Sequence, residues 1–505
     1  MSGLPRGWAQ ARISDILFIR NGYAFKSTYF CDDGVPLIRQ SELKGNLVDL
    51  SESVCLPESF LEDHSDYLIT KGDVLIGMSG SLGKVSLYLS DRPALQNQRT
   101  GLLIVDELAA DKTFALYALK YVEPQILKQG KGVAVQNVST SQIESCGLLL
   151  PPRAEQTRIV AKLEELLSDL DAGVAELKAA QKKLAQYRQS LLKAAVEGAL
   201  TAEWRKQHPA TESGAQLLAR ILQERRARWE AKQLAKFAEQ GKTPPKDWQK
   251  KYPEPVQPDT TDLPALPEGW VWATIDQLAA IGTGVTPLKS KSQYYVGGDI
   301  PWVTSGALNN ETVTEAIDYV TPIALEECRL ELYPAGALLV AMYGEGKTRG
   351  KCSELAIPAT INQAIAALVL EDTAIGCKPY VKLFLLKSYD DMRNQASGGV
   401  QPNLNLQIVR SIAIPIPPVN EQQAITGIVS TQLEAVKEQR EAIDQSLKQS
   451  TAQRQNILRA AFAGQLVPQD PNDEPANVLL ERIRAERAQR AATVKPRKRQ
   501  PKEPG

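Results

Sequence analysis

Short apolar runs alternate with polar turns over residues 1–150 and again over residues 263–416. Runs of this kind, bounded by Gly, Asp or Asn, are typical of buried β-strands. The expected strands are at 73–78, 101–105, 337–342 and 364–370. Longer runs predict one helix in each stretch, at 113–128 and at 378–395. Each stretch ends in a Pro-Pro pair, which stops the preceding strand and starts a new element.

A long polar helix with a narrow apolar stripe is predicted after each Pro-Pro pair. The stripe uses two positions in seven, which is typical of a coiled-coil seam. The first helix, from Ala154 to Val196, would be about 64 Å long at about 1.5 Å per residue. The predicted seam consists of Val160, Leu163, Leu167, Leu170, Val174, Leu177 and Leu184, and then of Val429, Leu433, Val436, Ile443 and Leu447. The alternative is two separate amphipathic helices on two cores, which such narrow stripes do not favour.

The chain is an internal duplication. The matched segments, in order, are LPRGW (4–8) with LPEGW (266–270), KGDVLIGMSGSLGK (71–84) with AGALLVAMYGEGK (335–347), LLLPPRAEQ (148–156) with IPIPPVNEQ (414–422), and LLKAAVEGAL (191–200) with ILRAAFAGQL (457–466). The offsets stay between 262 and 266. A repeat of this length means two copies of a whole module and excludes a short solenoid unit.

Composition argues against a disulfide or metal framework. The chain has 505 residues, 43% of them hydrophobic, and its apolar runs stay below the roughly 18 residues of a membrane span. Six scattered cysteines without a Cys-x-x-Cys, and two histidines, disfavour a disulfide scaffold, a zinc ribbon and a His-rich metal site. They suit a reducing compartment, and the first ten residues do not resemble a signal peptide. We therefore expect a cytoplasmic protein.

Charge is balanced overall, with 59 basic and 59 acidic residues, but it is unevenly distributed. The net charge is −3 over 1–150, −4 over 263–416, +3 over 201–262 and +6 over the last 25 residues. Residues 201–240 look helical, and the seven prolines of 242–267 predict an extended linker. Charged blocks of this size are most often solvated faces.

No catalytic motif is repeated with the modules. The segment GEGKT at 344–348 resembles a phosphate-binding P-loop, but Ala341 stands where the first glycine should be. The equivalent loop of the first module has no Ser or Thr after Lys84. A duplicated chain without a duplicated catalytic constellation indicates a binding protein, for which we expect no cofactor and no metal.

Polar and basic side chains recur in loops flanked by glycine. Arg, Lys, Asn and Gln are the side chains that read base edges in DNA. The polar stretch 96–99 matches 362–363, and residues 136–137 match 401–403. The candidates are Lys84, Gln96, Asn97, Arg99, Lys347, Arg349, Asn362 and Gln363. On the residues alone, turn chemistry before a strand explains these positions better than base readout does.

The order of these features resembles the specificity (S) subunit of type I restriction–modification systems. The resemblance depends on LP-x-GW at the start of each half, on the Pro-Pro-x-x-Glu-Gln motif, and on the helix end L-x-x-A-A-x-x-G-x-L. LTAEWR at 200–205 also resembles the family. It implies an α+β fold: two mixed α/β target-recognition domains separated by two long antiparallel helices that form a coiled coil.

The resemblance also implies a function. Each recognition domain would read one half of an asymmetric bipartite DNA site through the loops named above. The helices would set the spacing and dock two methyltransferase (modification) subunits, and restriction/translocase subunits would complete the complex. The chain itself would carry no active site, whereas the assembly would be an adenine DNA methyltransferase and an ATP-dependent endonuclease. The alternatives are a coiled-coil scaffold that binds no DNA and, less favoured, an enzyme.

We accordingly expect six segments. They are a first recognition domain (1–152), a first long helix (153–200), a basic helical segment with a Pro-rich linker (201–262), a second recognition domain (263–416), a second long helix (417–467), and a short helix with a basic tail (468–505).

Overall fold

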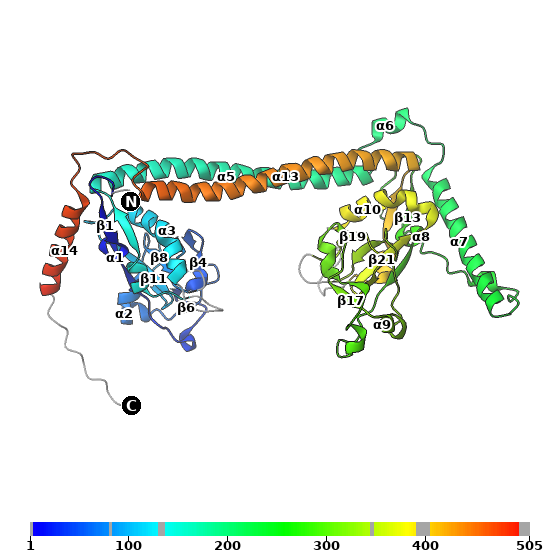
Figure 1. Ribbon diagram of the computed structural model, residues 1–505, viewed down its shortest axis with the longest axis horizontal. Helices are drawn as coiled ribbons and strands as arrows, with labels where there is room; N and C mark the ends of the chain where they lie inside the picture. Colours follow the sequence, from blue (N-terminus) through cyan, green and yellow to red (C-terminus); the bar gives the residue numbers. More distant parts are fainter. Residues whose placement is uncertain (1–3, 80–82, 130–136, 344–347, 390–403, 494–505) are drawn as a thin grey trace. The chain divides into compact units, whose positions relative to one another are not determined.

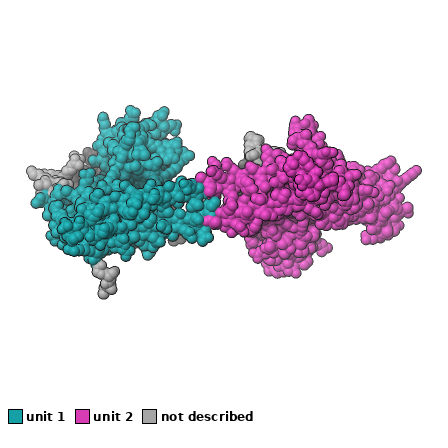
Figure 2. All heavy atoms as spheres, turned by 90° about the horizontal axis from the view of Figure 1, so that it is seen from above, with its two compact units in different colours: residues 1–178, 443–505 teal, residues 179–442 magenta. Residues whose placement is uncertain are grey.

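A computed structural model describes residues 4–79, 83–129, 137–343, 348–389 and 404–493. The chain forms two compact units, and each unit combines segments from both halves of the sequence (Figure 2). Unit 1 comprises residues 1–178 and 443–505, and unit 2 comprises residues 179–442. The described part of the chain contains no helix that is long and apolar enough to span a membrane.

Two helices of 44 residues, α5 (Arg153–Val196) and α13 (Val419–Phe462), contribute to both units (Figure 1). In unit 1, Asp171 of α5 forms an ion pair with Arg454 of α13. In unit 2, the Tyr187 hydroxyl of α5 donates to Gln432 Oε1 of α13 over 3.1 Å. A later residue of α5 contacts an earlier residue of α13, so the two helices are antiparallel.

The predicted seam residues are all buried or half-buried. The predicted stripe missed Ile159, which is 1% exposed, whereas its predicted neighbour Val160 is half-buried. The first turns of each helix also pack on a sheet domain, since Ile159 of α5 joins the core of unit 1 and Ile425 of α13 joins the core of unit 2. The expectation that the stripes are too narrow to pack on a domain is therefore wrong for the helix ends, where an extra apolar position widens the stripe.

Sheet domain 1 (residues 9–150) lies in unit 1, and its described residues form three sheets. The strands of the largest sheet follow the order β2 (Leu17–Asn21), β11 (Thr100–Val105), β8 (Val74–Gly77), β9 (Val85–Leu87), β5 (Leu47–Val48), β4 (Leu43–Lys44). The second sheet has the order β6 (Cys55–Leu56), β3 (Val35–Ile38), β10 (Ala94–Gln96), β7 (Leu68–Ile69). In the third sheet, β1 (Ala9–Arg12) pairs with β12 (Gly147–Leu150). The helices of this domain are α1 (Ile13–Ile16), η1 (Ser27–Tyr29), η2 (Gln40–Glu42), α2 (Phe60–Asp63), η3 (Ser65–Tyr67), α3 (Lys112–Gln129) and α4 (Thr140–Glu144).

Sheet domain 2 (residues 271–416) lies in unit 2 and repeats this plan. The strands of its largest sheet follow the order β14 (Ala279–Thr283), β21 (Ile365–Leu370), β18 (Leu338–Ala341), β19 (Cys352–Leu355), β16 (Thr312–Val313). The second sheet has the order β17 (Asp318–Val320), β15 (Ile300–Val303), β20 (Thr360–Ile361). In the third sheet, β13 (Val271–Thr274) pairs with β22 (Ala413–Ile416). The helices among its described residues are α8 (Ile275–Leu278), η5 (Ser292–Tyr294), η6 (Ser305–Asn309), α9 (Pro322–Glu327), η7 (Asp372–Cys377), α10 (Lys378–Lys387) and α12 (Leu406–Ser411).

The central strands are apolar throughout because both of their faces are covered. In β8, Val74 and Ile76 face the core that contains α3, whereas Leu75 faces a second cluster on the opposite side. Successive side chains of a strand alternate between faces, so a strand buried on both sides shows no polar alternation. Helix α10 ends at Lys387, before the predicted 395, and residues 390–395 lie outside the described residues.

The two sequence motifs at the domain boundaries contact each other. The Trp8 indole of LPRGW donates to Glu155 Oε2 over 3.0 Å, and the Trp270 indole of LPEGW donates to Glu421 Oε2 over 2.9 Å. Gly7 before Trp8 has φ +79°, a conformation that favours glycine. These contacts join the first strand of each domain to the first turn of the helix that follows it.

A further helix follows each long helix. In unit 2, α6 (Ala202–Gln207) leads to α7 (Gly214–Glu239), which is followed by the short η4 (Trp248–Lys251). In unit 1, α13 is followed by α14 (Ala476–Thr493).

Candidate nucleic-acid interface

Four separate chain segments of sheet domain 1 meet at one surface hollow. Backbone bonds hold them together: Tyr23 N–H donates to Gln96 O (3.0 Å), Gln98 N–H to Tyr23 O (2.9 Å) and Met78 N–H to Arg99 O (3.2 Å). Ser79 also forms a bridge with Asn137. The hollow has a volume of about 260 Å³, and the polar residues that line it are Asn21, Ser79, Gln98, Arg99, Asn137, Ser139 and Thr140.

The exposed side chains at this hollow are suited to reading base edges. Asn21, Gln98, Arg99 and Asn137 are all exposed. Arginine pairs with guanine, and Asn or Gln pairs with adenine, through two hydrogen bonds each. Gly22 permits the close approach of two segments, since a Cβ there would lie 2.2 Å from the Asn97 carbonyl oxygen.

Of the predicted residues in this domain, Arg99 lies at the hollow, and Asn97 lies beside it and is half-buried. Asn97 performs turn chemistry through its backbone, donating to Ile38 O (3.0 Å) and accepting from Thr100 N–H (3.1 Å). Asn21, Gln98 and Asn137 were not among the predicted site residues. Gln98 and Asn137 stand in the polar stretches noted in the sequence, whereas Asn21 gave no signal beyond an Asn-Gly turn.

Gln96 occupies a core position, so the structure corrects its assignment as a DNA-facing residue. Its side chain is 0% exposed, and its Nε2 donates to Arg20 O (3.0 Å) and Thr100 O (2.7 Å). The position ends strand β10, whose residues are all buried. The sequence alone does not show that a polar residue at the end of a strand is buried, because its burial depends on the neighbouring sheet.

Lys84 lies away from this hollow. It is exposed and borders a larger hollow of about 670 Å³ between sheet domain 1 and α13 within unit 1. Lys120, Glu123 and Arg454 line the same hollow. Burial raises the pKa of Glu123 and lowers the pKa of Lys120. The first module therefore presents two separate polar surfaces where the sequence suggested one.

In sheet domain 2 the candidates are only partly described. Lys347 and the stretch 401–403 lie outside the described residues. Arg349 is half-buried. Asn362 Oδ1 accepts from Ala364 N–H over 3.1 Å, which is turn chemistry, and Gln363 is exposed with its Oε1 accepting from the Thr286 hydroxyl. Thr286, which the sequence did not single out, therefore joins the candidate surface.

The described residues offer little for catalysis. They contain no group of three or more His, Cys, Asp or Glu that could hold a metal ion. Burial raises the pKa of Cys352 to about 12, and it also raises the pKa of Cys55, Cys146 and Cys377. Thiols with a raised pKa are poor nucleophiles because the thiolate is the reactive form.

Together, the fold and the surface define a duplicated binding protein in which two sheet domains are joined by paired helices. The chain matches the family described as type I restriction modification DNA specificity domain over residues 5–180 and 267–448. These ranges cover more than half of the chain, which therefore belongs to the family of type I specificity subunits. Its role is DNA recognition, and it is a non-catalytic component of a restriction–modification system.

Individual relatives agree with this assignment. The chain is 36% identical to the type I restriction enzyme EcoBI specificity subunit of Escherichia coli over 199 residues, which are 39% of this chain and 40% of that protein. It is 24% identical to the EcoDI specificity subunit of Escherichia coli over 498 residues, which are 96% of each chain. A solved chain, described under complex assembly and conformational transition of the type I R-M system, aligns at TM-score 0.63 and 16% identity, covering 92% of this chain and all of that one. It shares the fold.

Proposed function

We propose that each sheet domain reads one half of a split, asymmetric DNA site. The observation that carries this proposal is a shared framework with unlike surface residues. Asn21 pairs with Gly101 across β2 and β11, and Thr283 pairs with Ala366 at the equivalent place in β14 and β21. By the same alignment, the exposed Arg99 corresponds to Ala364, which is buried and has no side chain that could read a base. Domains that differ at these positions would read different bases.

The long helices would set the distance between the half-sites and would dock two methyltransferase subunits. Each helix supplies residues to both units, so its length would govern the gap between the two reading surfaces. Restriction/translocase subunits would join to complete the complex. The chemistry, adenine methylation and ATP-dependent cleavage, would come from these partners.

The partners would also supply much of the phosphate neutralisation. Residues 1–150 and 263–416 carry net charges of −3 and −4, which is unusual for surfaces that approach DNA. Base contacts give specificity, whereas phosphate contacts give much of the affinity. A chain that mainly reads bases needs cations from elsewhere in the assembly.

The proposal is tested by the methylation pattern of DNA from a host that carries the complete system. Methylation-sensitive long-read sequencing should report a motif with two unlike halves separated by a nonspecific gap. Equal domains would produce a palindrome, since the symmetry of a protein is mirrored in its site. A palindromic motif would contradict the proposal, and a chain that shifts no split-site duplex, with or without its methyltransferase, would instead be a scaffold.

A further inference from the structure

The distal part of α7 and the segment that returns from it form a small body, which we call the lysine arm (residues 229–252). It extends from the rest of unit 2 (Figure 1). Gly241 ends the helix with φ +63°, and Lys242 N–H donates back to Phe237 O over 3.0 Å. This reversal is a C-terminal cap that requires a left-handed residue, which glycine adopts without strain.

Aromatic rings hold the returning segment on the helix. Trp229 stacks on Trp248, with ring centroids 5.8 Å apart, and also contacts Tyr252 at 5.4 Å. Phe237 meets Trp248 edge-on at 6.2 Å. The arm therefore has its own small apolar core, although each of these four rings is only half-buried. A folded projection is able to present side chains in a fixed arrangement.

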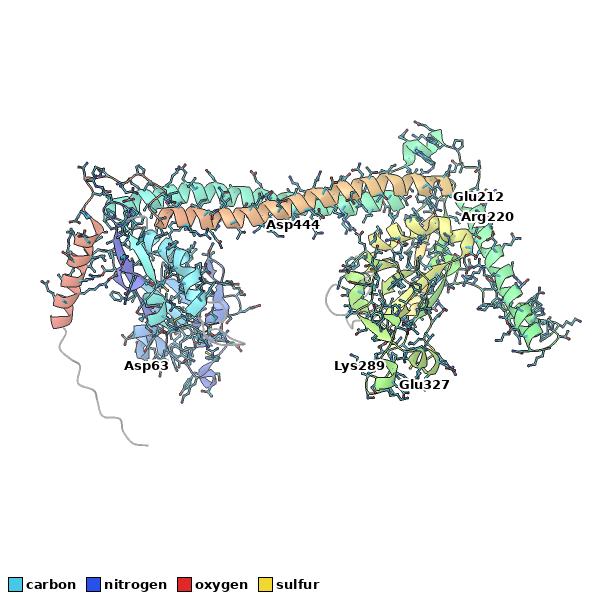
Figure 3. All side chains as sticks on the ribbon, viewed as in Figure 1. Asp63, Glu212, Arg220, Lys289, Glu327 and Asp444 are labelled. Atoms are coloured by element: carbon cyan, nitrogen blue, oxygen red, sulfur yellow. The ribbon has the colours of Figure 1, made fainter. Side chains whose placement is uncertain are left out.

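Two arginines of α7 attach the helix to sheet domain 2. Arg228 bonds to Glu371 over 2.7 Å and to Asp372 over 2.6 Å, and Arg225 donates to the Asp276 carbonyl. At the start of the helix Arg220 pairs with Glu212, which precedes α7, over 2.9 Å; both residues are labelled in Figure 3. Arg225 and Arg228 are thus used to dock α7 on sheet domain 2.

The lysines of the arm, in contrast, are not used in this way. Lys232, Lys236, Lys242, Lys246, Lys250 and Lys251 are all exposed. Lys250 forms an ion pair with Asp247 over 3.0 Å. Among the described residues, no carboxylate lies within 4.0 Å of the other five lysines. The arm contains three carboxylates, Glu230, Glu239 and Asp247, so its net charge is +3.

The part of α7 that docks on sheet domain 2 has an equivalent in unit 1. Helix α14 of unit 1 corresponds to the docking part of α7, and Arg487 donates to the Ser14 carbonyl over 2.8 Å as Arg225 donates to the carbonyl of Asp276. The ion pairs that dock α7 on sheet domain 2 end at Arg228, so the lysine arm lies beyond the docking part of the helix. Apart from the ion pair of Lys250 with Asp247, the lysines of the arm have no described ion pair.

We propose that the lysine arm binds the phosphate backbone of DNA that flanks the half-site read by sheet domain 2. The inference rests on the proposed DNA-reading function. Lysine suits this role because its ammonium group is a compact point charge that binds a phosphate without requiring a fixed geometry. Both sheet domains are acidic, so free cations on a projecting arm would offset the repulsion between the chain and DNA.

The test compares the full chain with a variant in which Lys232, Lys236, Lys242, Lys246 and Lys251 are replaced by Gln. Affinity is measured against salt concentration for a long duplex with the split site, and for a short duplex that ends at the site. Each phosphate contact contributes about 0.9 to the slope of log K against log salt. On the long duplex the variant should lose a slope of about 2 or more and bind at least about tenfold more weakly at low salt. On the short duplex the two chains should bind equally.

Replacement of the same five lysines by Arg is the matched control, and it should restore the slope because the charge is kept. If the wild-type chain discriminates the split site and the Gln variant keeps the full slope, the arm does not bind DNA. A Gln variant that keeps its DNA affinity but fails to assemble with the methyltransferase would show that the arm docks a protein, which also overturns the inference. A wild-type chain that does not discriminate the site would refute the proposed function itself.

Discussion

At the scale of single residues, the two Trp–Glu contacts show how a duplicated chain has diverged. Glu421 is 1% exposed, and it accepts from Arg205 Nη2 (2.7 Å) and from the Thr201 hydroxyl (2.7 Å) in addition to Trp270. Glu155 is 0% exposed and accepts from Trp8 and from Gln469 Nε2 (3.2 Å). Among the described residues, no Lys or Arg lies within 4.0 Å of the Glu155 carboxylate. Burial raises the pKa of Glu155 as a result.

The substitutions Glu155→Gln and Glu421→Gln should therefore differ in their effect on stability. An amide can still accept from Trp8, so Glu155→Gln should leave the free energy of unfolding at pH 7 within about 1 kcal/mol of the wild type, or raise it. Glu421→Gln removes the charge that pairs with the partly buried Arg205, and it should cost about 1–3 kcal/mol. Thermal or denaturant unfolding of the full chain measures both.

The pH dependence has a definite sign. Because the pKa of Glu155 is raised in the folded chain, its contribution to stability is fully present below the unfolded value of 4.5 and is lost as pH rises through the folded value. In the Glu155→Gln variant, the free energy of unfolding should lack the decrease that Glu155 causes as the pH rises just above 4.5. Equal destabilisation by the two substitutions would show that the missing cation near Glu155 has no energetic consequence.

The candidate reading residues give a second prediction at this scale. Arg99→Ala should weaken recognition of one half-site by about 1–3 kcal/mol if the guanidinium pairs with a guanine. Replacement of Lys347 and Arg349 by Ala should affect the other half-site and leave the first unchanged. Binding is measured with duplexes in which one half-site at a time is scrambled. The half-site that a variant is not expected to affect serves as the internal control. Loss of affinity for every duplex, including scrambled ones, would indicate phosphate contacts instead of base readout.

At the scale of elements, the paired helices α5 and α13 are the proposed ruler. Seven residues inserted in both helices, after Leu177 and near Ile443, keep the heptad phase and preserve the seam. The insertion lengthens each helix by about 10 Å at about 1.5 Å per residue. DNA rises about 3.4 Å per base pair, so the nonspecific gap should grow by up to about three base pairs.

The two half-site sequences should be unchanged by this insertion, and methylation mapping reports both quantities together. Helix tilt and DNA twist reduce the gain, so a growth of one or two base pairs also agrees with the proposal. An insertion in α5 alone is the control, since it leaves seam positions without partners and should destabilise the pair. A folded double-insertion variant that methylates at the original spacing would show that the helices do not set the gap.

At the scale of the whole molecule, each compact unit combines one module with the helix that follows the other module. Unit 1 contains the end of α13 and all of α14, and Ala476 N–H donates to Gly7 O over 2.8 Å. Unit 2 has the equivalent bond from Gly214 N–H to Gly269 O over 2.7 Å. The helix that follows one module therefore docks on the other module, which ties the two copies into one recognition subunit.

The repeated motifs and the periodic apolar stripes were enough to predict the plan of this protein. Repeated motifs at nearly constant offsets required two copies of one module, and the heptad stripes predicted the long paired helices. The doubly buried strands, such as β8 and β18, were predicted because both of their faces are apolar. These features are local or periodic, so they can be recognised without knowledge of the tertiary contacts.

Which polar side chains reach the surface depends on packing between segments that are distant in the sequence. Gln96 and Arg99 are three residues apart in one polar stretch, yet Gln96 is enclosed between strands while Arg99 borders a hollow. Asn21 and Asn137 join Arg99 because strand pairing brings distant segments together. The partner of each Trp–Glu contact and the free lysines of the arm also depend on packing. For a polar residue in a loop or at the end of a strand, exposure depends on the neighbours that the fold supplies, and the apolar pattern along the chain does not encode it.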